Sequence, residues 1–323
     1  MGVVKDMVLG LKSGDVVEVK SLAEIRETLD GRGEFQGVPF MPEMERFCGH
    51  RLRVSKRADK ICVELEQMLD FRRLENAVFL DEVRCDGSAH DGCQKLCLIF
   101  WKEAWLKRLP EGSDAEPPID WVKSFPRQTP PPIDENKTYS CQSTAVYRAT
   151  QPIAQWDPRQ YLRDLRSRAL KPRELAQVLF LEAYNAVARR RGRREFGGIF
   201  GHLKKTPSAT LGLEGGELVR VKSKQEILDT LDEKGKNRGM YFSLDMTRNC
   251  GQRLRVITPV KRMILEHNGK MKQISNTVLL EGGECSGLCN RGCARGGHPL
   301  WREVWLEKAG PGAAPTDSKS SAP

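Results

Sequence analysis

The chain contains 323 residues, enough for two or three domains, and 39% of them are hydrophobic. Its mean hydropathy of −0.51 and its short apolar runs exclude a membrane-spanning helix from the expected structure. The net charge of +10 at pH 7 favours acidic partners. Nucleic acid is the first candidate, because Lys and Arg neutralise its phosphates.

The chain contains an internal repeat. Residues 14–54 align with residues 216–256 without a gap at an offset of 202, and 21 of these 41 positions are identical. Each copy also contains four cysteines. Such self-similarity indicates that one small domain occurs twice.

Both copies begin with the same local elements. Residues 15–20 alternate in the manner of a strand, and Ser21 with Glu24 forms a capping box at the start of a short helix. Further strands are expected at residues 51–54 and 77–80. The second copy repeats these elements at residues 218–221, 223–231, 253–256 and 277–280.

The repeat and the changes in composition divide the chain into five regions. These are a first cysteine-rich β repeat (1–109), a proline-rich linker (110–137), a helical insert (138–209), a second cysteine-rich β repeat (210–309) and a disordered tail (310–323). In the insert, Leu175, Leu179, Ala183 and Val187 step by four along one helical face, which we expect to be well buried.

Eight of the ten cysteines form one quartet in each copy. The quartets are Cys48, Cys85, Cys93 and Cys97, and Cys250, Cys285, Cys289 and Cys293. Because the N-terminus has no visible export signal, we expect a cytoplasmic protein whose thiols stay reduced. The quartets therefore predict metal sites rather than disulfides, and Cys62 and Cys141 are interpreted as ordinary buried thiols.

Zinc is the expected metal, with two ions per chain, because it favours four thiolate or imidazole ligands in a tetrahedron. The clustered spacing differs between the copies, since Cys97 lies beyond the aligned pair and Cys289 lies within it. Either the fourth thiolate reaches the metal from a different direction, or His90 and His298 complete sites of three thiolates. A closed site of this kind stabilises a fold and argues against metal catalysis.

Residues 85–90, Cys-Asp-Gly-Ser-Ala-His, resemble the iron–sulfur signature of the CDGSH family. That family places histidine directly after serine and has an upstream Cys-x-Cys, whereas here Ala89 intervenes and the upstream pair is absent. Four thiolates also bind an iron–sulfur cluster, so such a cluster is the alternative to zinc.

Basic residues form two groups, one on and after the strand that contains Arg51 and Arg53, and one at the end of the insert helix. Both groups are expected to contact phosphates, although the first also suits a solvated strand face and the second a helix C-terminus. The candidate nucleic-acid-binding residues are Arg51, Arg53, Lys56, Arg57, Arg189, Arg190, Arg191, Arg193, Arg194, Arg253 and Arg255.

Signatures of common enzyme classes are missing. The sequence contains no P-loop, dinucleotide fingerprint, GxSxG or HExxH, and none of its five histidines recurs in both copies. The recurring tryptophans are interpreted as core residues, namely Trp101, Trp105, Trp301 and Trp305. We therefore lean towards a protein without enzymatic activity.

The chain as a whole resembles an uncharacterised family of bacterial proteins with two cysteine-rich SH3-like repeats. The matching segments are FMPEMERFCGHRLRV, VRCDGSAHDGCQ, FWKEAWLKR and the middle stretch 139–161. The resemblance implies this organisation and no particular activity.

Together these observations predict an α+β, mainly β protein of tandem SH3-like small-barrel repeats, each with a cysteine metal site. The predicted function is that of a zinc-stabilised binding or scaffold protein that contacts nucleic acid. The alternatives are a protein-interaction adaptor for a partner enzyme and an iron–sulfur or redox protein.

Overall fold

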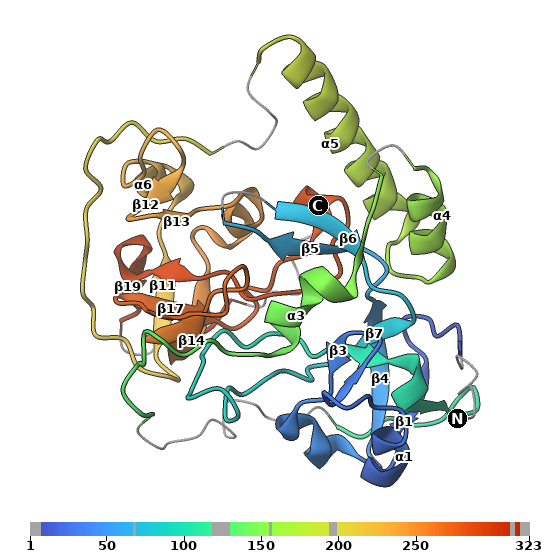
Figure 1. Cartoon of the computed structure of the whole chain (residues 1–323). Coiled ribbons are helices and arrows are strands. Elements are labelled where there is room, and N and C mark those ends of the chain that lie inside the picture. Colours follow the sequence, from blue (N-terminus) through green and yellow to red (C-terminus); the bar gives the residue numbers. More distant parts are fainter. Residues whose placement is uncertain are drawn as a thin grey trace. The chain divides into compact units, whose positions relative to one another are not determined.

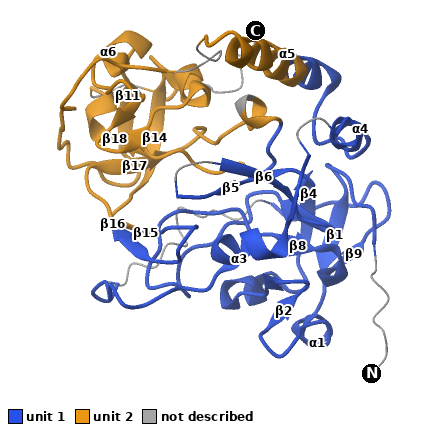
Figure 2. Ribbon diagram, turned by 45° about the horizontal axis from the view of Figure 1, so that its top comes forward, with its two compact units in different colours: residues 1–177, 263–272, 292–295 blue, residues 178–262, 273–291, 296–323 orange. Residues whose placement is uncertain are grey.

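The computed structural model describes residues 8–66, 69–117, 130–154, 157–193, 199–310 and 314–316, except for the side chain of Cys289. The chain forms two compact units (Figure 2). Unit 1 contains Met1–Gln177, Met263–Lys272 and Gly292–Arg295, and unit 2 contains Val178–Arg262, Gln273–Arg291 and Gly296–Pro323. Part of the predicted linker, most of the predicted tail and Arg194 lie outside the described residues. No described helix is long and apolar enough to span a membrane.

Each unit contains one five-stranded antiparallel sheet (Figure 1). The strand order in unit 1 is β8 (Trp101–Lys102), β7 (Ala77–Leu80), β4 (Arg51–Arg57), β1 (Val16–Val19) and β9 (Leu106–Arg108). In unit 2 it is β18 (Trp301–Arg302), β17 (Thr277–Leu280), β14 (Arg253–Pro259), β11 (Leu218–Val221) and β19 (Leu306–Lys308). Two similar sheets confirm the prediction of a mainly β protein, and neither forms a closed barrel among the described strands.

Shorter elements connect these strands. Unit 1 contains α1 (Leu22–Arg26), β2 (Glu34–Phe35), β3 (Val38–Pro39), η1 (Pro42–Phe47), β5 (Ile61–Glu64), β6 (Leu69–Arg73), η2 (Glu103–Trp105), α3 (Gln142–Ala149), β10 (Gln151–Pro152) and α4 (Arg159–Arg166). Unit 2 contains α6 (Lys224–Leu228), β12 (Lys236–Asn237), β13 (Met240–Tyr241), η3 (Leu244–Asn249), η4 (Leu288–Asn290) and η5 (Glu303–Trp305). The unit boundaries cross α5 (Pro172–Arg190), β15 (Arg262–Ile264) and β16 (Met271–Gln273).

The predicted capping boxes are present in both copies. Ser21 Oγ accepts a hydrogen bond from the Glu24 backbone N–H at 3.3 Å, and the Glu24 carboxylate accepts one from the Ser21 N–H at 2.9 Å. Ser223 and Glu226 form the same pair of bonds at 3.3 and 2.7 Å. These bonds satisfy backbone donors that the first turn of a helix leaves unpaired, so they define where α1 and α6 begin.

The recurring tryptophans are fully buried in both units, which confirms their interpretation as core residues. In unit 1 the ring of Phe40 lies edge-on to Trp105, with ring centroids 5.4 Å apart. Trp105 Nε1 also donates a hydrogen bond to Thr28 Oγ1 at 3.0 Å. Unit 2 repeats both contacts through Phe242, Trp305 and Thr230. Trp105 and Trp305 therefore have both an apolar contact and a polar partner, whereas Trp101 Nε1 and Trp301 Nε1 are buried without a hydrogen-bond partner among the described residues.

In each unit, a buried glutamate secures the segment that precedes the first strand of the five-stranded sheet. The Glu103 carboxylate accepts hydrogen bonds from the backbone N–H groups of Leu9, Gly10 and Leu11 at 2.7, 3.1 and 3.0 Å. It also pairs with the Arg57 guanidinium at 2.5 Å. In unit 2, Glu303 accepts from the equivalent Leu211 and Gly212 amides. An unpaired buried carboxylate would be costly, so these donors make its burial tolerable.

Helix α5 confirms the helix predicted in the insert, but its expected burial is wrong. Leu179 and Val187 are 42% and 46% exposed, and Phe180 is 64% exposed. The buried side chains of α5 are those of Val178 and Ala188. A four-residue step shows that apolar side chains share a face, and it does not show that another element covers that face.

The segments that follow the two repeats bind the same strand position. Glu116 exchanges hydrogen bonds with the backbone of Arg51 in β4, through its own N–H at 2.8 Å and its carboxylate at 3.1 Å. Thr316 does the same with Arg253 in β14, at 3.0 Å for both bonds. This part of the predicted disordered tail is thus held against the sheet of unit 2.

Changing Glu103 to Gln tests the buried carboxylate, because an amide presents N–H groups to the backbone donors and removes the charge beside Arg57. We expect Glu103→Gln to lower the free energy of unfolding of unit 1 by about 2–3 kcal/mol. Glu303→Gln is the matched variant, because Pro259 occupies the position in unit 2 that Arg57 occupies in unit 1. We expect this variant to lower the free energy of unfolding of unit 2 by about 1 kcal/mol. Urea unfolding followed by tryptophan fluorescence measures both losses. Equal losses of unfolding free energy in the two variants would show that the ion pair with Arg57 does not contribute to the effect of Glu103→Gln.

Candidate metal centre

The loop between β7 and β8 brings Cys85 and Cys97 side by side. The Cys85 N–H donates to the Cys97 carbonyl oxygen at 2.8 Å, and the Ile99 N–H donates to the Val83 carbonyl oxygen at 3.1 Å. Arg84 and Leu98 form an antiparallel bridge between these bonds. The two ends of the loop therefore pair like short strands, although they are far apart in sequence.

A tight turn returns the chain between these two ends and positions Cys93. The N–H groups of His90 and Gly92 both donate to the Gly87 carbonyl oxygen, at 3.0 and 3.1 Å. Gly87 has a φ of +75°, and a Cβ at this position would collide with the Cys93 carbonyl oxygen. Only glycine fits this conformation and this close approach.

A fourth thiol, Cys141, reaches the same place from the start of α3. The next residue, Gln142, binds the Phe100 backbone in both directions: its Oε1 accepts from the Phe100 N–H at 2.7 Å, and its Nε2 donates to the Phe100 carbonyl at 3.0 Å. Ser143 Oγ lies 3.4 Å from Cys97 Sγ. The N-terminus of α3 is thereby fastened to the cysteine loop.

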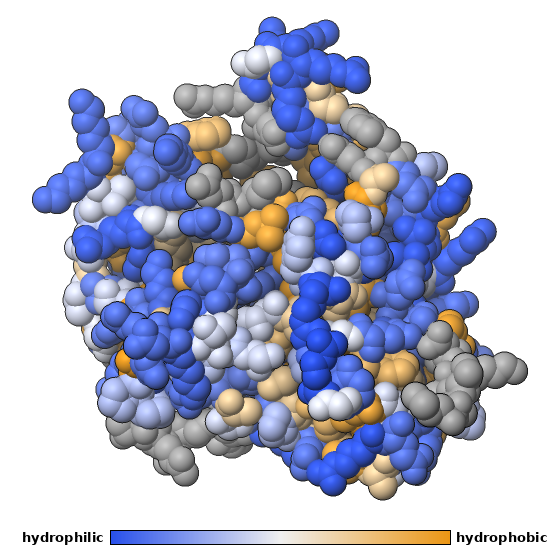
Figure 3. Space-filling model, in the orientation of Figure 1, coloured by the Kyte–Doolittle hydropathy of each residue, from blue (hydrophilic) through white to orange (hydrophobic). Residues whose placement is uncertain are grey.

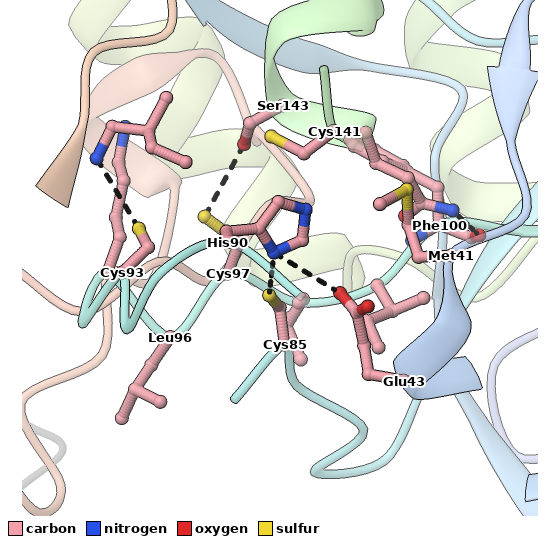
Figure 4. Close-up of a pocket in the computed structure, with 15 residues that line it drawn as sticks. Met41, Glu43, Cys85, His90, Cys93, Leu96, Cys97, Phe100, Cys141 and Ser143 are labelled. Atoms are coloured by element: carbon pink, nitrogen blue, oxygen red, sulfur yellow. Dashed lines mark hydrogen bonds and ion pairs between the residues drawn. The ribbon is translucent and has the colours of Figure 1, made fainter. Parts of the chain in front are cut away.

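The four thiols line one pocket of unit 1 (Figure 4). The cavity has a volume of about 40 Å³, enough for roughly three water molecules and hence more than a single ion. Apolar side chains form much of its wall. The lining residues include Met41, Glu43, His90, Lys95, Leu96, Ile99, Phe100, Ser143 and Ile264. Cys85, Cys93 and Cys97 are among the ligands that the sequence predicts, whereas the sequence indicates an ordinary buried thiol at Cys141.

The predicted ligand Cys48 lies elsewhere. It ends η1 and packs against the hydrophobic core of unit 1, and Cys250 packs against the core of unit 2 in the same way. Burial raises the pKa of both thiols. The two Cys-Gly pairs recur because the cysteine packs in the core and the glycine turns the chain, with φ of +82° at Gly49 and +78° at Gly251.

Burial also governs the ionisation of three pocket thiols, those of Cys85, Cys93 and Cys141. It raises the pKa of Cys93 to about 11, with the neighbouring Cys97 adding to the shift. Burial, and then Glu43 and Cys97, raise the pKa of Cys85, and burial raises that of Cys141. These groups are therefore neutral thiols at pH 7 unless a cation binds them, because a bound metal stabilises the thiolate form.

Beside Cys85 lie two buried side chains with unsatisfied atoms. His90 Nδ1 is 3.8 Å from Cys85 Sγ and 3.8 Å from Glu43 Oε1. His90 Nε2 and Glu43 Oε2 have no hydrogen-bond partner in the described part of the chain. Burial lowers the pKa of His90, which favours the neutral imidazole that binds metals. Glu43, Cys85 and His90 together offer three ligand atoms within 4.8 Å of one another.

The described cysteines of the second quartet are divided between the two units. The Cys285 N–H donates to the Gly297 carbonyl at 2.9 Å, so the second loop closes as the first does, with glycine in place of Cys97. Cys293 belongs to unit 1, and its Sγ lies 3.1 Å from Cys62 Sγ. Cys250 packs in the core of unit 2, and the side chain of Cys289 lies outside the described residues. His298 Nδ1 is 3.7 Å from Glu284 Oε1.

The predicted nucleic-acid residues have different surroundings. Arg51 and Arg53 are exposed on one face of β4, and Arg253 and Arg255 are exposed on β14. Arg57 is different, because it is only 10% exposed and pairs with Asp59 and Glu103, and Lys56 is partly buried. Arg189, Arg190, Arg191 and Arg193 are exposed at and after the end of α5. Hydrophilic residues cover most of the face drawn in Figure 3, and nucleic-acid binding stays a prediction.

An ion pair holds the far end of α3 against β2. The Glu34 carboxylate, 6% exposed, accepts two hydrogen bonds from the Arg148 guanidinium, one of them 2.7 Å long. The hydrogen bond from Arg148 lowers the pKa of Glu34 below its ordinary value of 4.5. The stabilisation is therefore present above pH 4.5 and is lost as the pH falls through the lowered pKa.

We expect Arg148→Met to lower the free energy of unfolding of unit 1 by about 1 kcal/mol at pH 7, a modest value because Arg148 is 44% exposed. The difference from the unmodified protein should shrink as the pH is lowered below 4.5. Urea unfolding at several pH values measures it. Arg159→Met, at an arginine 83% exposed, is the control and should change little. A loss that is the same at low pH would contradict the role of the Glu34 charge.

No family model matches this chain, and neither the curated proteins nor the solved structures include a detectably similar one.

Proposed function

We propose that unit 1 binds an iron–sulfur cluster through Cys85, Cys93, Cys97 and Cys141, and that the protein works in electron transfer. One observation carries this proposal: four thiols from two distant segments line one pocket, and among the described residues no three of their sulfurs lie within 4.8 Å of one another. The proposal assigns one centre to the chain, in unit 1, in place of the two zinc sites expected from the repeat.

The spacing of the thiols favours a cluster over zinc. With Zn–S bonds of about 2.3 Å, tetrahedral geometry places the sulfurs of a four-thiolate zinc site about 3.8 Å apart. Among the described residues, the only group of three ligand atoms within 4.8 Å of one another is Glu43, Cys85 and His90, which includes one thiol of the four. In a [4Fe–4S] cluster each thiolate binds a different iron, and in a [2Fe–2S] cluster the four thiolates are divided between two irons. In both, the four thiolates do not converge on a single ion.

The surroundings also suit an anionic cluster. The Ser143 hydroxyl and the Ile264 N–H lie 3.4 Å from Cys97 Sγ and Cys93 Sγ respectively. Hydrogen bonds to cluster sulfurs help set the reduction potential. Lys95 lines the pocket and is paired with Glu64 at 2.7 Å, so a positive charge is held close to the thiolates.

The chemistry follows from the ligand count. Four protein thiolates leave no open position at the irons, and apolar walls limit access of water. A cluster held in this way exchanges electrons with a partner and does not bind a substrate directly. The protein then acts as a redox module, consistent with the absence of common enzyme motifs from its sequence.

A mononuclear zinc site is the second candidate, and one observation favours it. The buried atoms His90 Nε2 and Glu43 Oε2 have no hydrogen-bond partner among the described residues, and both residues lie beside Cys85. Zinc bound by Glu43, Cys85 and His90 would satisfy three of its four usual positions.

We further infer that both sheets are SH3-like. In each unit a 3₁₀ helix, η2 or η5, connects the last two strands, which stand at opposite edges of the sheet order. A connection of this kind carries the chain from one edge to the other, which is how a small barrel approaches closure. Such modules serve as scaffolds for binding sites.

Purification without oxygen, or reconstitution with iron and sulfide, tests the cluster. We expect a brown protein that contains iron and acid-labile sulfide in equal amounts. Cys141→Ser should lose most of the iron and the visible absorption. Cys48→Ser is the matched control, because Cys48 packs in the core, and it should keep both.

A colourless protein with one zinc per chain would contradict the cluster. In that case, loss of zinc in both Glu43→Gln and His90→Ala, with zinc retained in Cys141→Ser, would support the mononuclear site.

A further inference from the structure

A second sulfur pair lies in unit 1, outside the pocket. Cys62 is in β5, and Cys293 is in the segment Gly292–Arg295, which belongs to the same unit. Their Sγ atoms are 3.1 Å apart, and the Cys62 N–H also lies 3.1 Å from Cys293 Sγ. Neither residue lines the pocket.

Backbone and side-chain bonds hold the two sulfurs together. The Ala294 N–H donates to the Lys60 carbonyl oxygen at 2.9 Å, and Arg295 Nη1 donates to the Cys62 carbonyl oxygen at 3.0 Å. The chain on the C-terminal side of Cys293 is therefore bound at two points, to Lys60 just before β5 and to Cys62 within it. A disulfide bond is about 2.05 Å long, so an approach of about 1 Å would join the two sulfurs.

The equivalent place in the repeat supplies a comparison. At the offset of 202, Cys62 corresponds to Ile264, and aligned from the tryptophans Cys293 corresponds to Cys93. The Ile264 N–H lies 3.4 Å from Cys93 Sγ, so the backbone contact is the same in kind. Ile264 has no sulfur that could pair with Cys93, and the Cys93 thiol lines the pocket instead. A thiol pair thus occurs at one of the two equivalent places.

We propose that Cys62 and Cys293 form a redox-active dithiol that closes to a disulfide by exchange with a low-molecular-weight disulfide. Cys62 is half-buried and Cys293 is 3% exposed, so Cys62 meets the external disulfide first. This inference does not depend on the proposed cluster.

The reaction takes two balanced steps. In the first, the Cys62 thiolate attacks one sulfur of the external disulfide; a mixed disulfide forms, and one external thiolate leaves and takes up the proton that Cys62 has lost. In the second, Cys293 Sγ attacks Cys62 Sγ as a thiolate, the mixed disulfide breaks, and the second external thiolate leaves with the proton from Cys293. Two electrons pass from the protein sulfurs to the external disulfide.

The pair is also connected to the pocket. Arg295 Nη2 donates to Ser143 Oγ at 3.0 Å, and Ser143 Oγ lies 3.4 Å from Cys97 Sγ. Arg295 is bound as well to Glu266 at 2.8 Å. A closed disulfide fixes Cys293, two positions before Arg295, to Cys62 in β5. We therefore expect the oxidised form to hold the hydrogen bonds that lead from Arg295 through Ser143 to Cys97 more rigidly.

The test equilibrates the full chain in buffers of reduced glutathione and glutathione disulfide. Acid quenching, alkylation and mass spectrometry of non-reduced peptides then identify the linked cysteines. We expect a peptide pair that joins Cys62 to Cys293, increasing with the fraction of glutathione disulfide and disappearing on reduction. In Cys293→Ser, Cys62 should carry one glutathione instead, and Cys48→Ser should form the Cys62–Cys293 link as the unmodified protein does.

Full alkylation of both cysteines in the most oxidising buffer would overturn the proposal, as would Cys62 linked mainly to a pocket cysteine. The measurement on the unmodified protein needs no variant, so a variant that fails to fold leaves the result intact. If the link forms in a protein that contains no iron, the cluster proposal fails and this one stands.

Discussion

The side-chain amide of Gln142 binds the backbone of Phe100 in both directions, and the candidate site depends on this contact. It fastens the first turn of α3 to the end of the cysteine loop, so Cys141 and Ser143 arrive at the pocket together. The Glu34–Arg148 ion pair secures the other end of the same helix. Without this docking, the pocket would be lined by the three thiols of the loop alone, whereas with it Cys141 and Ser143 form a further part of its wall.

The shared and the divergent features of the two repeats lie in different places. Strands, capping boxes, tryptophans and the buried glutamate recur, and each of them serves packing or backbone hydrogen bonding. The pocket depends on Cys97, His90 and Cys141, which have no counterparts in the second copy: Gly297 and Asn290 stand at the positions aligned with the first two. Duplication preserved a scaffold, and one copy carries the cysteine pocket.

This difference explains how far the sequence could predict the structure. Local signals were sufficient for the capping boxes and for strands β1, β4 and β7 with their repeats, because alternation and N-cap chemistry act over a few residues. Three of the four pocket thiols were also predicted, since they occur in one loop. The fourth ligand was predicted to be Cys48, because this cysteine recurs as Cys250 in the second copy. A cysteine can recur because it packs in the core as readily as because it binds a metal. Cys141 is brought in by a tertiary contact, and its spacing from the loop carries no signal of that contact.

The bonds of Glu116 to Arg51 and of Thr316 to Arg253 have a consequence for how the chain may be shortened. In each sheet they occupy a backbone N–H and carbonyl of a strand that would otherwise present them to solvent. Free strand groups of this kind are templates for pairing with another chain. A recombinant protein that ends after β19, as the apparent domain border would suggest, therefore exposes the backbone of β14 and gains a tendency to self-associate. Glu116 and Thr316 therefore act as covers for the two sheets, and the folded module of unit 2 includes Thr316.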